Sequence, residues 1–204
     1  GGTYNWSVTV DNVSGGNWSF KTDDKIYPLN DRSVDVTENK SLIPIQIRNH
    51  EVSKNKITFL RFDIPSTITD SHKINLNLVV DGDSTLNGGI SIQEYGQMGW
   101  GESPNNKNIG IIDHSLGATI ATLTSLDNGT TVWDNGTAVS LDNGTTLSVD
   151  LSDKITSYGE EYSIAIRALE TTDKVTFFSK EKRSIDKGGG YSHKKSVWPN
   201  LTFN

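Results

Sequence analysis

Apolar and polar side chains alternate along most of this chain, as they do in strands that bury one face. Between residues 74 and 80 every second residue is a large aliphatic one, and asparagines stand between the first of them. The same period of two recurs at 4–10, 43–47, 147–151 and 162–168. No window of helical length carries an apolar stripe of period 3.6. The pattern therefore predicts an all-β protein made of short strands.

Two segments, 57–64 and 175–178, are apolar on both faces, which is typical of strands in the middle of a sheet. A chain of 204 residues is long enough for one sandwich domain. We therefore predict an antiparallel, two-sheet β-sandwich that is jelly-roll-like. We divide the chain into an N-terminal strand segment, residues 1–20, and a single sandwich domain, residues 21–204.

Residues 125–131 and 140–146 share the sequence Ser-Leu-Asp-Asn-Gly-Thr-Thr, and a third Asp-Asn-Gly stands between them. Asp-Asn-Gly tolerates positive φ and closes tight turns, which predicts a meander of very short strands or a ruffled loop. Each of the three turns is also an Asn-x-Thr sequon. The repeat is either simple turn chemistry or a set of three adjacent glycan sites.

The charge balance excludes two classes of partner. The chain carries 19 Lys and Arg against 25 Asp and Glu, a net charge of -6, and no basic stripe. Phosphate backbones are bound by clustered cations, so we expect no nucleic-acid partner. No apolar run reaches 18 residues, so we expect no membrane span. Cysteine is absent, which removes disulfides and thiol chemistry.

Asn-x-Ser/Thr sequons occur eight times, whereas the composition would give about four by chance. An Asn- and Thr-rich β-protein can collect sequons accidentally, and the alternative is a glycosylated exterior. The second interpretation predicts an extracellular or cell-surface location. The candidate glycosylation sites are Asn5, Asn12, Asn17, Asn39, Asn128, Asn135, Asn143 and Asn200.

Catalytic motifs are missing from the sequence. The four histidines stand far apart, and there is no Gly-x-Ser-x-Gly elbow or phosphate-binding glycine loop. We therefore predict that the protein is not an enzyme and requires no cofactor. Asp81 and Asp83, with asparagine and glycine shortly after them, form a candidate structural calcium loop. The other interpretation is an acidic turn between strands.

Trp100 and Trp133 are the candidate carbohydrate-binding residues, because flat aromatic rings stack on the apolar faces of sugars. Trp100 stands in a glycine-rich segment, and Trp133 stands between two Asp-Asn-Gly turns. Either tryptophan could instead cap the core of the sandwich.

The N-terminal segment is an amphipathic strand in which Tyr4, Trp6, Val8 and Val10 share one face. Such a strand either belongs to its own sandwich or completes the sheet of a neighbouring subunit by donor-strand complementation. In the second case, the four side chains fill an apolar groove of the neighbour. The contact is then head-to-tail, and repeating it gives a filament.

The segment 58–65, Thr-Phe-Leu-Arg-Phe-Asp-Ile-Pro, resembles the "yLRFDls" strand of the DNRLRE-type domain, a group that overlaps carbohydrate-binding module family 96. The resemblance covers about Lys21 to Phe203 and rests on the order of several weak motifs. The insert 125–146 and the N-terminal residues 1–20 depart from the family pattern. The other segments that carry the resemblance are 74–80, 93–95, 100–102, 147–152, 162–168, 177–181 and 198–203.

The resemblance implies a jelly-roll-like sandwich of secreted and cell-surface proteins, often found beside polysaccharide-degrading enzymes, with some members that bind anionic polysaccharides. The sequence as a whole supports two functions. The first is a non-catalytic extracellular structural protein: a glycosylated subunit of a surface filament, sheath or adhesive layer, assembled head-to-tail by exchange of its N-terminal strand. The alternative is a carbohydrate-binding module that recognises an extracellular polysaccharide.

Overall fold

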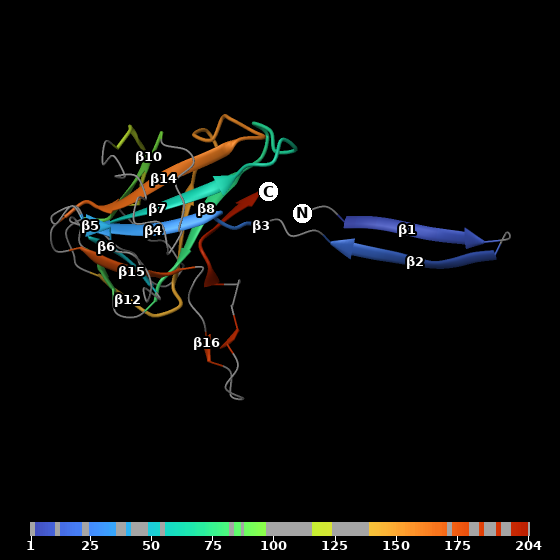
Figure 1. Ribbon diagram of the computed structural model, residues 1–204, viewed down its shortest axis with the longest axis horizontal. Coiled ribbons are helices and arrows are strands. Elements are labelled where there is room, and N and C mark those ends of the chain that lie inside the picture. The colour runs from blue at the N-terminus through green and yellow to red at the C-terminus, as the bar shows by residue number, and fades with distance from the viewer. Residues whose placement is uncertain are drawn as a thin grey trace.

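The computed structural model describes residues 3–10, 13–21, 25–35, 40–41, 49–53, 56–81, 84–86, 88–96, 116–123, 139–170, 173–179, 184–185, 191–192 and 197–203. All regular elements in these ranges are strands apart from a short 3₁₀ turn near residue 197, and every pairing is antiparallel (Figure 1). The predicted all-β, antiparallel β-sandwich is confirmed, and its second layer is divided into two sheets where the sequence predicts one. No helix in the described part of the chain is long and apolar enough to cross a membrane.

The first layer is a six-stranded sheet with β7 and β14 at its centre. Phe62 stands opposite Tyr162 in this central pair, and Leu60 opposite Ile164. The prediction that the segment 57–64 is a central strand is therefore confirmed. In spatial order the strands are β11 (Thr119–Leu123), β10 (Ile90–Glu94), β14 (Glu161–Ala168), β7 (Lys56–Asp63), β4 (Asn30–Asp35) and β5 (Lys40–Ser41).

The second layer consists of two four-stranded sheets joined where Val80 pairs with Phe177. At the same junction the Asp81 backbone N–H donates to the Thr176 carbonyl at 2.7 Å. One sheet, which we call the amide sheet, contains β13 (Thr146–Asp150), β8 (Ile74–Val79), β18 (Asn200–Phe203) and β3 (Lys25–Ile26). The other contains β12 (Val139–Leu141), β9 (Ser84–Leu86), β15 (Lys174–Phe178) and β6 (Asn49–Ser53).

The main core lies between the two layers and follows the alternation read from the sequence. Leu76 and Leu78 of β8 are at most 1% exposed, whereas Asn75 and Asn77, which alternate with them, lie on the outer face. Leu60 and Ile164 face them from the first layer with 0% and 1% exposure. Burying each such aliphatic side chain contributes about 1.5–3 kcal/mol of transfer free energy, so this core stabilises the sandwich.

A second, smaller core covers the outer face of β7 and β14. Its buried members are Ile57, Phe59, Tyr95 and Ala165, and the rings of Phe59 and Tyr95 lie 4.7 Å apart. Phe59 is therefore buried on the face opposite Leu60, which explains why the segment is apolar at consecutive positions. The two central strands of the first layer are buried on both sides.

One buried carboxylate connects two loops at the edge of the sandwich. Asp173 precedes β15 and is 1% exposed. Its oxygens accept hydrogen bonds from the backbone N–H groups of Gly88 at 3.0 Å, Gly89 at 3.1 Å and Glu170 at 3.0 Å. Gly89 has φ = 106°, a left-handed conformation that glycine adopts without strain. The turn before β10 is thereby fixed to the loop between β14 and β15.

Four described strands stand outside the two layers. β16 (Ser184–Ile185) and β17 (Tyr191–Ser192) form one two-stranded sheet. β1 (Thr3–Val10) and β2 (Val13–Lys21) form another. Figure 1 shows β1 and β2 side by side, away from the strands of the sandwich. The β1–β2 sheet ends at Lys21, close to the boundary that the sequence predicts between the N-terminal segment and the sandwich.

Candidate functional site: the N-terminal hairpin

β1 and β2 form an antiparallel hairpin in which only Asp11 and Asn12 separate the two strands. Its register sets Tyr4 opposite Phe20 and Trp6 opposite Trp18. The predicted N-terminal strand therefore pairs within its own chain, and its partner is β2 and not a strand of the sandwich.

The register shifts between Ser7 and Thr9, where β2 has one residue more than β1. Ser7 stands opposite Asn17 and Thr9 opposite Ser14, so the extra residue lies at Gly15-Gly16. Such a bulge changes which residues of β2 share a face with β1, because a strand alternates with a strict period of two.

Alternation and register together divide the hairpin into two unlike faces. One face carries seven apolar positions along the whole hairpin, and we call it the aromatic face. Four of them lie before the bulge, with no polar position among them. The other face carries Thr3, Asn5, Ser7, Asn17 and Ser19, and therefore holds the sequon asparagines of both strands. The positions of the aromatic face are Tyr4, Trp6, Val8, Val10, Val13, Trp18 and Phe20.

A two-stranded hairpin is at best marginally stable alone in water, and an amphipathic one gains stability when its apolar face is covered. Among the described strands β1 and β2 pair only with each other. The hairpin also has two outer edges that can add a further strand. These features make it the strongest candidate interaction site in the described part of the chain.

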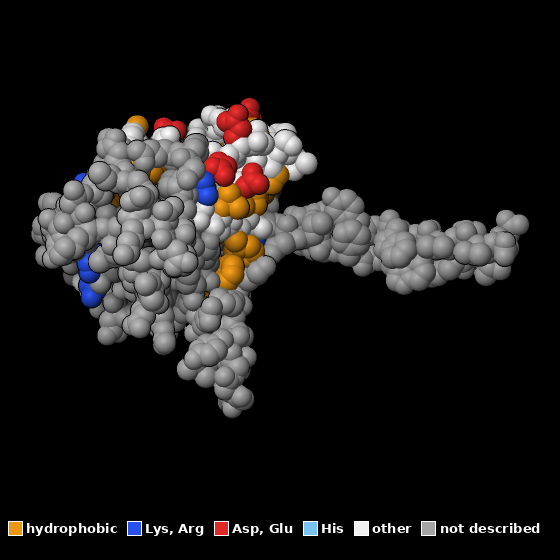
Figure 2. Space-filling view, viewed as in Figure 1, with side chains coloured by type: hydrophobic (Ala, Val, Ile, Leu, Met, Phe, Trp, Pro, Cys, Tyr) orange, Lys and Arg blue, Asp and Glu red, His pale blue; other side chains and the backbone are white. Residues whose placement is uncertain are grey.

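Few large apolar side chains are exposed on the described part of the sandwich itself. Leu29 is 43% exposed and Leu169 is 37% exposed. Figure 2 shows small apolar areas beside acidic side chains on this surface. Among the described strands outside the sandwich, the hairpin carries more apolar positions than the β16–β17 sheet does, so a docking interaction there gains the most from the hydrophobic effect.

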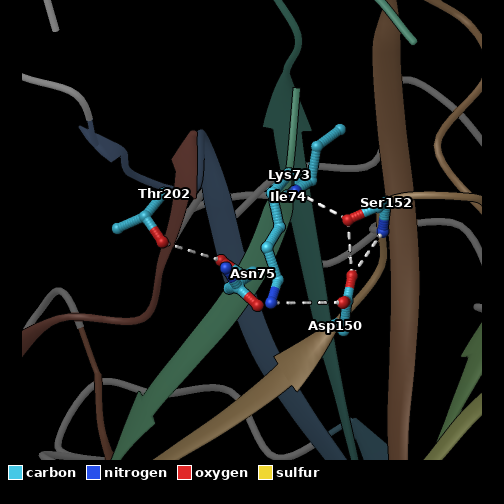
Figure 3. A network of polar contacts seen from close by, with 6 residues as sticks. All are labelled: Lys73, Ile74, Asn75, Asp150, Ser152 and Thr202. Atoms are coloured by element: carbon cyan, nitrogen blue, oxygen red, sulfur yellow. Dashed lines mark hydrogen bonds and ion pairs between the residues drawn. The ribbon is translucent and has the colours of Figure 1, made fainter. Parts of the chain in front are cut away.

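The outer face of the amide sheet is a network of polar side chains (Figure 3). Ser152 donates from its hydroxyl to Asp150 at 2.5 Å and from its backbone N–H at 3.0 Å. These two hydrogen bonds, aided by the Lys73 ammonium 3.8 Å away, hold the pKa of the Asp150 carboxyl below its usual value. The Ser152 hydroxyl in turn accepts from the Ile74 N–H at 3.0 Å, so the network fixes the end of β13 to the start of β8.

The neighbouring row of this face is formed by amides and a hydroxyl. The Asn77 side-chain nitrogen donates to Asn200 Oδ1 at 3.2 Å and to Thr202 Oγ1 at 3.1 Å. Asn200 donates to the Trp198 carbonyl at 2.9 Å. The Trp198 ring meets Tyr27 edge-on with their centroids 5.8 Å apart. The polar groups of this row mostly bind one another, so the face is ordered by its own contacts.

Arg61 lies on the outer face of the first layer and connects three strands. It donates to Glu161 at 3.0 Å and to the Asn30 carboxamide oxygen at 3.1 Å. Because the Arg61 side chain is 13% exposed, this ion pair is screened less than one on the open surface. Arg61 belongs to the Leu-Arg-Phe run of β7, and its role here is to join β4, β7 and β14.

The predicted sugar-binding and calcium residues fall mostly in segments without a described position. Trp100, Trp133 and Asp83 lie outside the described residues. Asp81 is 7% exposed, and the described residues contain no group of three or more metal-ligating side chains. The structural calcium site and the two sugar-binding tryptophans therefore stay predictions.

The predicted glycosylation sites fall in different settings. Asn143 is exposed, whereas Asn200 is 3% exposed. Asn5 and Asn17 lie on the polar face of the hairpin by register. The remaining four, Asn12, Asn39, Asn128 and Asn135, lie outside the described residues.

Comparison of the sequence with protein-family models and with curated proteins gave no match. The resemblance to the DNRLRE-type domain therefore stays a prediction. The function of this chain has to be inferred from its own hairpin, sandwich and sequons.

Proposed function

We propose that this protein is a non-catalytic extracellular structural protein: a glycosylated subunit of a surface filament, sheath or adhesive layer that associates head-to-tail through its N-terminal hairpin. The observation that carries the proposal is the aromatic face of the hairpin, seven apolar positions on a two-stranded sheet that pairs with no other described strand.

The area of the aromatic face matches what a specific interface needs. A buried aromatic side chain covers about 150–250 Å². Four of them, at Tyr4, Trp6, Trp18 and Phe20, supply roughly 600–1,000 Å². A standard interface buries about 800 Å² on each partner, so this face alone is large enough to hold a second subunit.

In the proposed assembly the hairpin of one subunit docks on a different part of its neighbour, so the contact is head-to-tail. A heterologous contact of this kind leaves one free hairpin and one free receiving surface after every addition. Repetition gives a ring if the rotation closes and a filament if it does not. Strand addition at an outer edge of the hairpin contributes further backbone hydrogen bonds.

A pair of matched charge substitutions tests the proposal. Trp6→Asp places a carboxylate on the aromatic face, and Thr9→Asp places one on the polar face without disturbing a sequon. We expect wild type and Thr9→Asp to assemble, as seen by sedimentation and negative-stain electron microscopy. We expect Trp6→Asp to remain monomeric with an unchanged melting temperature of the sandwich.

Deleting residues 1–21 should likewise give a folded monomer, because the hairpin pairs with no described strand of the sandwich. The proposal is wrong if Trp6→Asp assembles as wild type does, or if wild type stays monomeric at high concentration. A monomeric wild type that is retarded in gels containing acidic or neutral polysaccharide, with loss of retardation in Trp100→Ala or Trp133→Ala, supports the carbohydrate-binding alternative instead.

A further inference from the structure

Two of the eight sequons lie where the structure describes the side chains, and their surroundings are opposite. Asn143 belongs to the turn between β12 and β13, and Asn200 begins β18. N-glycosylation joins the side-chain nitrogen of asparagine to a sugar and adds a bulky, hydrated group. A modified asparagine therefore needs both an accessible nitrogen and open space around it.

Asn143 has both. It is the second residue of a four-residue turn that is closed by the Thr145 N–H donating to the Asp142 carbonyl at 3.0 Å. Asp142, Asn143 and Gly144 are all exposed. Gly144 has φ = 90°, the value that the third position of a type II turn requires, and there is open space where its side chain would be. The turn presents the asparagine to solvent.

Asn200 has neither. It is 3% exposed, its side-chain nitrogen donates to the Trp198 carbonyl at 2.9 Å, and its side-chain oxygen accepts from Asn77 at 3.2 Å. The sequon hydroxyl, that of Thr202, donates to the Asn75 carbonyl at 3.5 Å (Figure 3). It also accepts from Asn77 at 3.1 Å. The Asn200 oxygen and the Thr202 hydroxyl thus join β18 to β8, whereas the Asn200 nitrogen binds the segment just before β18.

We propose that Asn143 carries an N-linked glycan and that Asn200 carries none. Asn200 instead serves as a structural amide that connects β18 to β8. A sugar on the Asn200 nitrogen would need the space that the amide sheet fills, so the modified residue is incompatible with this packing whether the glycan is attached before or after folding. The inference rests on the extracellular location in the proposed function.

The reaction at Asn143 is a group transfer from a polyisoprenyl-phosphate-linked oligosaccharide, catalysed by an oligosaccharyltransferase of the host. The side-chain nitrogen attacks the anomeric carbon, and a C–N bond forms. The bond between that carbon and the phosphate oxygen breaks, and its electrons leave with the lipid phosphate. The nitrogen gives up one of its two protons, so no oxidant or reductant is needed.

The test is glycopeptide mass spectrometry of the full chain secreted from an N-glycosylating eukaryotic cell line. We expect the peptide with Asn143 to carry glycan and the peptide with Asn200 to be unmodified. Asn143→Gln and Thr145→Ala should each lower the intact mass by one glycan, because each removes the same sequon. An unmodified Asn143 or a glycosylated Asn200 in the folded protein overturns the inference.

Glycan occupancy of Asn200 is measured in the wild-type chain, so the result does not depend on whether Asn200→Gln folds. In addition, Asn200→Gln should lower the melting temperature more than Asn143→Gln does, since Asn200 is buried in the amide network whereas Asn143 is exposed. Assembly is measured separately, by sedimentation of the unglycosylated chain. Failure of the glycan test and failure of hairpin assembly are therefore distinguishable.

Discussion

Replacing Asp173 tests whether one buried carboxylate holds two loops of the sandwich together. Its oxygens accept from three backbone N–H groups, those of Gly88, Gly89 and Glu170, at 3.0 to 3.2 Å. Asp173→Ala removes the acceptor from all three donors. Asp173→Asn keeps one oxygen but places an N–H₂ group where the second oxygen was. Both variants leave the strands themselves unchanged.

The expected loss follows from the burial of the donors. A buried donor left without an acceptor costs about 1–3 kcal/mol. Gly89 is buried, whereas Gly88 is half-buried and can recover part of the loss by binding water. We therefore expect Asp173→Ala to lower the free energy of unfolding by about 2–5 kcal/mol, and Asp173→Asn by about half of that. At about 2–4 °C per kcal/mol, the alanine variant melts roughly 4–20 °C below wild type.

Urea unfolding followed by circular dichroism measures these differences, and Asp153→Asn is the matched control because Asp153 is exposed. The control should remain within about 0.5 kcal/mol of wild type, as most surface substitutions do. If Asp173→Ala unfolds at the same urea concentration as the control, the carboxylate does not hold the loops and the reasoning fails.

Two further predictions concern the titration of single groups. The Tyr162 hydroxyl is buried and has no hydrogen-bond partner among the described residues, so Tyr162→Phe should be neutral or up to about 1 kcal/mol stabilising at pH 7. Burial, together with the nearby Glu94, raises the pKa of Tyr162 to about 12. Wild type should therefore lose stability relative to Tyr162→Phe as the pH rises from 10 to 12. Urea midpoints that stay equal over this pH range would contradict the prediction. In Ser152→Ala the pKa of Asp150, which the Ser152 hydrogen bonds lower, should rise towards its usual value, as followed by carboxyl carbon NMR. The lowered pKa stabilises the fold above pH 3.8, and this contribution fades on acidification. The difference in stability between wild type and Ser152→Ala should therefore narrow at low pH, although the loss of the Ile74 N–H acceptor remains.

The fold could be predicted because a period of two survives wherever one face of a strand is buried. β8 is the clearest case, with aliphatic residues inward and Asn75 and Asn77 outward. The central position of β7 could also be predicted, because Phe59 and Leu60 are both apolar and are buried on opposite faces of the strand. These signals depend on neighbouring residues in one strand, so no knowledge of the partners was needed.

The strand that pairs with β1 could not be predicted from the sequence in the same way. The aromatic positions Trp18 and Phe20 are even-numbered, whereas Val13 is odd-numbered, because the bulge at Gly15-Gly16 changes the parity of β2. The apolar residues of β2 therefore do not keep a strict period of two, so the sequence pattern does not identify this segment as a strand. The two-residue connection Asp11-Asn12 between Val10 and Val13 is the signal that could have identified the hairpin.

Features that depend on contacts between distant residues were not predictable from the sequence. Asp173 is one acid among 25 Asp and Glu, and nothing near it indicates that it meets Gly88 and Gly89 from 84 or 85 residues away. Likewise, the sequon pattern is the same at Asn143 and Asn200. Only the packing of β18 against β8 distinguishes an exposed amide from a buried one.

The position of β18 has a consequence for how the chain reaches this structure. β18 ends at residue 203, yet it stands between β8 and β3, inside a sheet whose first strand begins at residue 25. The pairing of Phe62 with Tyr162 also joins residues far apart in the chain. Closing such long loops costs entropy before any contact compensates for it, so folds of this kind form slowly. A chain emerging from the ribosome cannot complete the amide sheet until residues 200–203 are free, whereas the pairs of the β1–β2 hairpin are local and form within microseconds.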